Sequence, residues 1–340
     1  MTGAIVGSSA NSDLVIDGGV TTLSGSNSYN GPTYIRNGAT LNANVAYALP
    51  TATGRTAVVI DDSGSGSSKL AIAVNQSVAS LTGASTSTVD LGNNTLTVGT
   101  DSGSTTFAGV ISGPGASLVK DNNSTQILTG ANTFSGSTTV SGGTLIADNT
   151  AATNTSGGAL QSTSDITVDA GGTVQVASSY QVNNTSTSIN LNGGTFKLSH
   201  VDSSTGTITE NVGALTLSAN SIIDMGTQSG GAVLTFASLT SWASGQTLSI
   251  YNWTGTMLKS GGTDQIIFSD TTGVSSHLSQ VYFYSDAGSS LIGGAMLYGN
   301  ELTAVPEPST YIGAVVLLGL IGWRERRRIS ALLRQAGKAA

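Results

Sequence analysis

The chain has 340 residues, of which only 9% are charged, 45 are glycine, 5 are proline and none is cysteine. The low charge and positive mean hydropathy argue against a swollen disordered chain, and the lack of cysteine excludes disulfides, thiolate metal sites and cysteine nucleophiles. Residues 1–305 carry six basic and 17 acidic residues, so we expect no binding to nucleic acid, which requires clustered Lys and Arg. This composition favours a long all-β chain with frequent tight turns.

Two segments of the chain have nearly the same sequence. Residues 23–41 are LSGSNSYNGPTYIRNGATL, and residues 128–145 are LTGANTFSGSTTVSGGTL. The corresponding pairs fall at every second position, as in β-strands: Leu23/Leu128, Gly25/Gly130, Asn27/Asn132, Tyr29/Phe134, Gly31/Gly136, Thr33/Thr138 and Ile35/Val140. An internal repeat of this kind predicts an architecture of stacked units.

The second half of the repeated segment also recurs alone, at 140–147, 168–177 and 191–199. Each copy has a hydrophobic residue, a Gly-Gly pair, a threonine and alternating apolar residues, a pattern typical of strand, tight turn and strand. The glycine pairs begin at 142, 171 and 193, in steps of 29 and 22 residues. A barrel of stacked hairpins and a parallel β-solenoid both fit, and the step length favours a right-handed parallel β-helix.

We expect the β-helix repeats to occupy residues 1–210. Residues 211–303 are richer in aromatic side chains and contain the predicted strands 248–253, 264–269 and 280–285. Larger side chains could seal the wide terminal coils, so this region is predicted to form further β-rich coils or a cap.

The C-terminal segment 304–328 combines three elements. The prolines of Val305-Pro306-Glu307-Pro308-Ser309-Thr310 block a helix just before the apolar stretch 311–323. A cluster of arginines follows, at Arg324, Arg326, Arg327 and Arg328. The stretch predicts a short transmembrane helix, and the arginines place the basic tail 329–340 in the cytoplasm and residues 1–305 across the membrane.

This tripartite tail resembles the PEP-CTERM sorting signal of Gram-negative bacteria. The resemblance implies an exosortase as partner, transient anchoring in the inner membrane, and delivery to the cell surface or extracellular matrix. The repeat at 128–147, and more faintly 20–41, resembles the autotransporter-associated β-strand repeat of passenger-type β-helices, which implies the same solenoid. Residues 1–12 contain no secretory signal, so we hypothesise that the N-terminus is truncated or that the start of the chain is misassigned.

Few residues are candidates for catalysis or metal binding. An acidic pair, acidic residues near turns and two histidines are interpreted as structural: Asp61-Asp62 as a solvated turn, Asp165, Asp169, Asp264 and Asp270 as turn caps, His200 beside Asp202 without a nucleophile or metal partner, and His277 as an exposed residue in a single helical turn. We therefore predict no catalytic residue, no metal and no cofactor.

These observations predict a non-enzymatic, exported structural or adhesive rod. Its many hydroxyl and amide groups suggest exopolysaccharide as a further partner. Two alternatives stay open: a polysaccharide lyase or glycosidase on a β-helix scaffold, and a C-terminal fragment of a larger adhesin.

Overall fold

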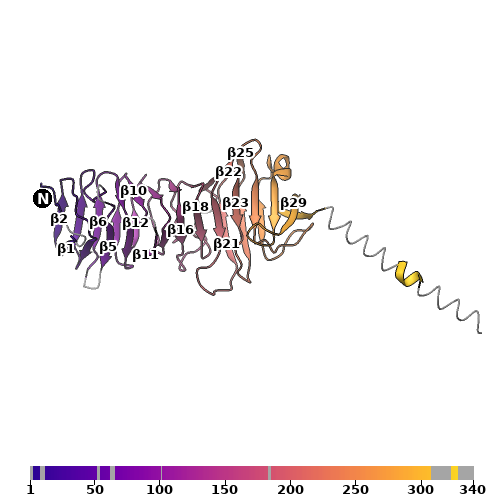
Figure 1. Ribbon diagram of the computed structural model, residues 1–340, viewed down its shortest axis with the longest axis horizontal. Coiled ribbons are helices and arrows are strands. Elements are labelled where there is room, and N and C mark those ends of the chain that lie inside the picture. Colours follow the sequence, from indigo (N-terminus) through magenta and orange to yellow (C-terminus); the bar gives the residue numbers. More distant parts are fainter. Residues whose placement is uncertain are drawn as a thin grey trace, which may run out of the picture.

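The computed structural model describes residues 3–7, 12–51, 54–61, 66–100, 102–182, 185–307 and 323–327. The body winds into an elongated, right-handed parallel β-solenoid of about 10 turns (Figure 1). This confirms the predicted all-β solenoid. Within the described ranges, no helix is long and apolar enough to cross a membrane.

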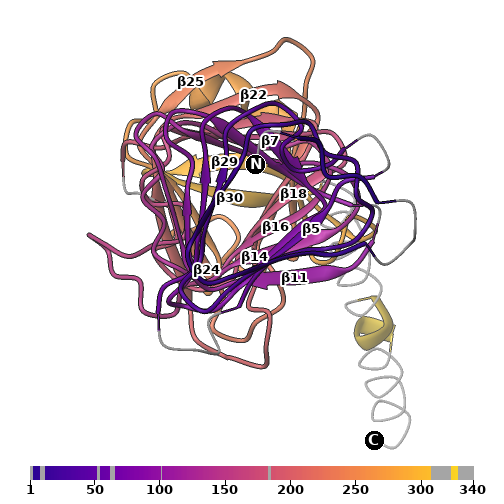
Figure 2. The same ribbon diagram turned by 90° about the vertical axis from the view of Figure 1, so that its left-hand side faces the viewer.

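Each turn runs along three sides of the shaft, which Figure 2 shows end on. Side 1 is a ladder that runs the length of the shaft, and its strands follow one another in the order β1 (Leu14–Asp17), β3 (Thr33–Arg36), β5 (Ala57–Asp61), β8 (Ser80–Gly83), β11 (Ser104–Phe107), β14 (Thr125–Leu128), β16 (Gly143–Ala147), β18 (Gly172–Val176), β20 (Thr195–Leu198), β23 (Ser221–Asp224), β26 (Leu248–Tyr251) and β28 (Val281–Tyr284). All of these pairings are parallel, which excludes the barrel of hairpins.

The other two sides carry strands over only part of their length. Side 2 contains β2 (Val20–Leu23), β4 (Thr40–Ala43), β6 (Lys69–Ile72), β9 (Thr88–Asp90) and β12 (Val110–Ser112), and later β21 (Ile208–Val212), β24 (Ala232–Phe236) and β27 (Gln265–Phe268). Side 3 contains β7 (Gln76–Val78), β10 (Thr95–Val98), β13 (Ser117–Lys120), β15 (Thr138–Val140), β17 (Asp165–Asp169), β19 (Ser188–Asn192), β22 (Leu215–Ala219) and β25 (Leu239–Trp242).

The predicted glycine steps are single turns of the solenoid. Gly143 is in register with Gly172, and Thr173 with Thr195, so steps of 29 and 22 residues each bring the chain back to side 1. Gly143 has a φ of 62°, which a side chain rarely adopts and which lets the chain turn the corner between β15 and β16. Along each strand every second side chain points inward, and these residues form one continuous apolar core along the axis.

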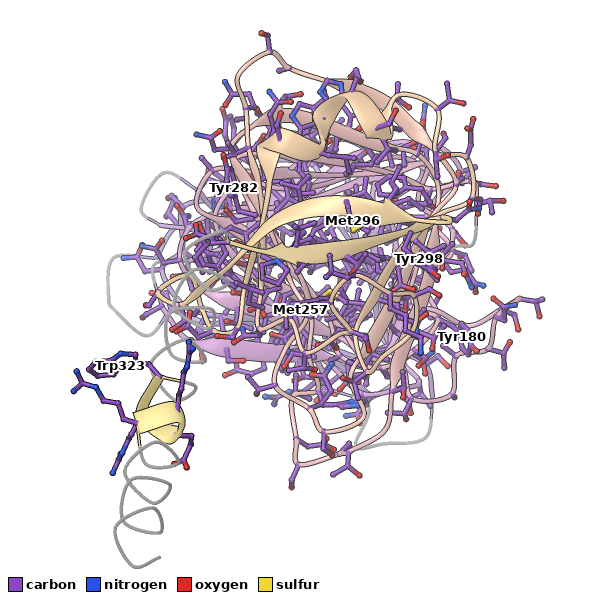
Figure 3. The ribbon with its side chains drawn as sticks, turned by 90° about the vertical axis from the view of Figure 1, so that its right-hand side faces the viewer. Tyr180, Met257, Tyr282, Met296, Tyr298 and Trp323 are labelled. Atoms are coloured by element: carbon purple, nitrogen blue, oxygen red, sulfur yellow. The ribbon has the colours of Figure 1, made fainter. Side chains whose placement is uncertain are left out.

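The aromatic-rich region extends the shaft and then closes it. The predicted strands 248–253, 264–269 and 280–285 are confirmed as β26, β27 and β28, and the rings of Phe236 and Phe268 stack across successive turns with 5.1 Å between centroids. The boundary expected at residue 210 falls inside β21, where the stack is continuous. After a 3-10 helix, η1 (Val274–Gln280), β29 (Leu291–Tyr298) and β30 (Glu301–Pro306) form an antiparallel hairpin across the end of the shaft (Figure 3).

Candidate functional site

The two copies of the repeat each place an asparagine inside the shaft. The Oδ1 of Asn27 accepts a hydrogen bond from Ile5 N at 2.7 Å, and its Nδ2 donates to Ala48 O at 2.7 Å. The Oδ1 of Asn132 accepts from Ile111 N, and its Nδ2 donates to Ala159 O, both at 2.8 Å. Each amide therefore bridges the turn before it and the turn after it, where the backbone has no strand ladder to satisfy its polar groups.

A pair of threonines completes each copy. Thr33 and Thr56 share a hydrogen bond of 3.0 Å, and Thr56 Oγ1 donates to Gly31 O at 3.0 Å. In the second copy, Thr138 and Thr163 are 3.1 Å apart and Thr163 Oγ1 donates to Gly136 O at 2.7 Å. The corresponding asparagines and threonines of the two segments thus make the same contacts, whereas Tyr29 adds a hydrogen bond of 2.7 Å between its OH and Thr33 that Phe134 cannot make.

The two copies nevertheless lie on different sides of the shaft. In the first copy the strandless stretch around Asn27 lies on side 3, between β2 on side 2 and β3 on side 1. In the second copy the stretch around Asn132 lies on side 2, between β14 on side 1 and β15 on side 3. The repeat therefore encodes a module of strand, amide-bridged stretch and strand, and any side can carry it.

Several ionisable side chains are also buried, among them Glu210 and Lys120. Glu210, in β21, is fully buried and accepts hydrogen bonds from Gln181 N at 2.6 Å and Val182 N at 3.1 Å. Burial raises the pKa of Glu210 to about 8, although the backbone donors oppose this shift. Lys120, in β13, points its Nζ at the carbonyls of Asp121, Asn122 and Gly142, and burial lowers its pKa to about 8.

The acidic residues selected from the sequence are not gathered together. Asp270 accepts a bond from Thr272 N and is the turn cap expected, whereas Asp264 is buried and accepts from Ala232 N, Thr254 N and Thr254 Oγ1. The turn-cap interpretation of Asp264 is therefore wrong, because its carboxylate joins two turns in the interior. Asp165 accepts a bond from Ser164 Oγ and Asp169 from Asn192 Nδ2 of the next turn. Asp61 ends β5, and Asp62 lies outside the described residues.

The two histidines have structural partners. The imidazole of His200 lies between the carbonyls of Ala177 and Gly206, at 2.7 and 3.0 Å, at the edge of a polar cavity of about 310 Å³. Asp202 lines the same cavity, and the hydrogen bonds from Ser204 hold its pKa below the usual range. His277 lies in η1 as expected, but it is half-buried because its ring stacks on Trp242. Among the described residues, no group of three or more His, Asp or Glu could hold a metal ion.

The sorting motif begins on the last strand. Val305 and Pro306 end β30, in register with Gly294 and Gly293, and Glu307 is exposed just beyond them. Pro308, Ser309, Thr310, residues 311–322 and Arg328 lie outside the described residues. Arg324, Arg326 and Arg327 lie in the short helical segment 323–327, where the Arg327 guanidinium stacks over the Trp323 ring at 3.8 Å.

Sequence reasoning aligned Asn27 with Asn132 but assigned no role to either. The signal was present, because both asparagines share the alternating phase of the buried Leu23 and Leu128 and so had to point inward. The same rule identifies Glu210, which alternates with Ile208 and Val212 in β21. A polar residue at an inward position indicates an internal hydrogen-bond partner.

The fold and these internal bridges define a repeat-bearing β-solenoid. The model of the passenger-associated-transport-repeat family matches residues 16–43 and 118–147, which are the two copies with their flanking strands. These two segments are thus similar to the passenger-associated repeat, and the predicted autotransporter-associated repeat is confirmed. Comparisons with curated proteins and with solved structures give no match.

Proposed function

We propose that this chain is an exported structural rod of a bacterial cell surface or extracellular matrix, sorted by an exosortase through its tail. The observation that carries the proposal is the way the shaft ends. The β29–β30 hairpin closes the stack. Strand β30 ends at Pro306, and the exposed Glu307 follows it at the edge of the folded body. A processing enzyme could thus act just beyond Pro306 while the shaft stays folded.

We propose no catalytic role for the shaft. The buried carboxylates of Glu210 and Asp264 are engaged by backbone N–H groups and are withdrawn from solvent, so they offer no acid or base to a soluble substrate. Only 9% of the residues are charged and many carry hydroxyl or amide groups, a composition that suits contact with polysaccharide. We therefore include exopolysaccharide binding in the proposed function.

The sorting part is tested by fractionating cells that contain an exosortase. Each variant carries the same cleavable secretory leader: the whole chain, a chain without residues 305–340, and the whole chain with Pro306→Ala and Pro308→Ala. We expect only the whole chain to lose its tail and reach the surface or matrix. A whole chain that keeps its tail, or a truncated chain that is sorted equally well, would overturn this part of the proposal.

A further inference from the structure

Tyr47 has a backbone conformation that tyrosine rarely adopts. Its φ is 60°, in the left-handed region, and the residue is 59% exposed. This conformation is unfavourable for a residue with a Cβ, and glycine would avoid the penalty. Strain of this kind persists only where the surroundings enforce it, and it concentrates at functional sites.

The surroundings of Tyr47 do enforce it. Gln76, buried in the next turn, donates to Val45 O at 2.8 Å and accepts from Leu49 N at 3.1 Å, so it holds the chain on both sides of Tyr47. Asn27, in the turn before, donates from its backbone N to Tyr47 O at 3.0 Å and from Nδ2 to Ala48 O. The repeat's own asparagine thus fixes the tyrosine.

Tyr47 lies at the edge of a small polar cavity. The cavity measures about 150 Å³, and its lining consists of Ala46, Tyr47, Leu49, Thr51, Asn75, Gln76 and Ser77, none of which is charged. The exposed Asn75 accepts a bond from Thr95 N, while its Nδ2 donates none within the described residues. An aromatic face beside neutral donors and acceptors is suited to a sugar ring, which has apolar C–H faces and hydroxyls at its rim.

We propose that Tyr47 and this cavity form a subsite for one neutral sugar unit of a polysaccharide, with the ring as a stacking platform. The inference deepens the polysaccharide binding of the proposed function and rests on it. A neutral glycan is specified because the cavity lining carries no cation and the body is acidic. The strain at Tyr47 is then maintained because it positions the ring.

The test titrates the whole chain with neutral hexasaccharides of glucose, mannose and galactose, and with hexagalacturonate as the charged probe. Tyr47→Gly and Tyr47→Asn remove the ring while suiting the backbone, so we expect about tenfold weaker binding of the neutral glycan with an unchanged or higher Tm. Tyr47→Phe keeps the ring and should bind like the original chain. Tyr298→Ala, at an exposed tyrosine on the terminal hairpin, is the control for a general loss of aromatic surface.

The outcomes separate the two proposals. If the original chain binds none of the hexasaccharides, neutral or charged, both polysaccharide binding and this subsite are wrong. If it binds, and Tyr47→Gly binds equally well, only the subsite is wrong. Preference for hexagalacturonate would overturn the assignment to a neutral glycan, and a fall in the Tm of Tyr47→Gly would show that the ring serves folding.

Discussion

The two copies of the repeat make the same contacts in different surroundings. The first copy lies near the N-terminal end of the shaft, where a Cβ on Gly25 would lie 3.0 Å from Gly3 O, a contact that a small shift relieves. The second lies within the stack, where a Cβ on Gly130 would come within 1.9 Å of Gly109 O. A solenoid is stabilised by contacts between neighbouring turns. The same motif can therefore contribute different amounts to the free energy of unfolding at different places along the shaft.

The largest effect is expected at these aligned glycines. Gly130→Ala should destabilise the surrounding turns by about 4–5 kcal/mol, because the carbonyl it meets belongs to backbone that cannot move aside. Gly25→Ala should cost about 1 kcal/mol or less. Hydrogen exchange measured by mass spectrometry would locate the loss, with faster exchange in β12 and β14 for Gly130→Ala. Equal effects of the two substitutions would contradict the dependence on neighbouring turns.

A second expected effect concerns pH. Both copies of the repeat bridge the turns with a neutral amide. In β21, by contrast, the carboxyl group of Glu210 accepts hydrogen bonds from backbone N–H groups of the preceding turn. The pKa of Glu210 is about 8 in the folded chain, against an ordinary value of 4.5 for a glutamate in water, so the folded state binds the extra proton between these values. The stability linked to Glu210 is therefore complete below about pH 4.5 and falls as pH rises towards 8, by on the order of 3–4 kcal/mol.

Glu210→Gln would make this bridge an amide, as in the repeats. We expect a flatter dependence of the free energy of unfolding on pH between 5 and 8, followed by denaturation at each pH. Some slope should remain, because burial also raises the pKa of Asp264 and Glu301. Asp165→Asn is the matched control at a less buried carboxylate. If the free energy of unfolding of Glu210→Gln changed with pH as steeply as that of the original chain, Glu210 would not be the source of the pH dependence.

Much of this fold was predictable because the signal is local. Alternation in 23–41 and 128–145 gives the inward face, and the Gly-Gly steps give the length of a turn. The side on which each copy lies was not predictable, because the module fits any of the three sides of the shaft equally well. That side depends on how many strands separate the two copies.

The sequence predicts that inward polar side chains have hydrogen-bond partners, but not which residues those partners are. An inward Glu210 indicates that a hydrogen-bond partner exists, but its partners Gln181 and Val182 lie 29 and 28 residues away, a distance set by an irregular turn. Tyr47 had no signal at all, because no residue pattern in its segment indicates a positive φ. The predicted sorting motif rests on residues of which most lie outside those that the structure describes.

The third and smallest effect is expected when each asparagine bridge is removed, and the two losses of stability can then be compared directly. Asn132→Leu removes a bond to Ile111 N and another to Ala159 O, and both groups stay buried, so we expect a loss of about 2–3 kcal/mol. Asn27→Leu leaves Ala48 O buried without its donor, but Ile5 N lies near the end of the shaft, where water can replace the amide, so the loss should be smaller, about 1–2 kcal/mol.

The measurement is denaturant unfolding of both variants, with hydrogen exchange to assign the loss to a region. Asn190→Ala serves as control, because within the part of the chain that the structure describes, the Nδ2 of Asn190 makes one long bond of 3.4 Å, to Thr167 Oγ1 on the outer face. If Asn27→Leu proves as costly as Asn132→Leu, then the terminal turn is as tightly packed as the middle of the shaft. The first copy would then owe its stability to something beyond its position in the stack.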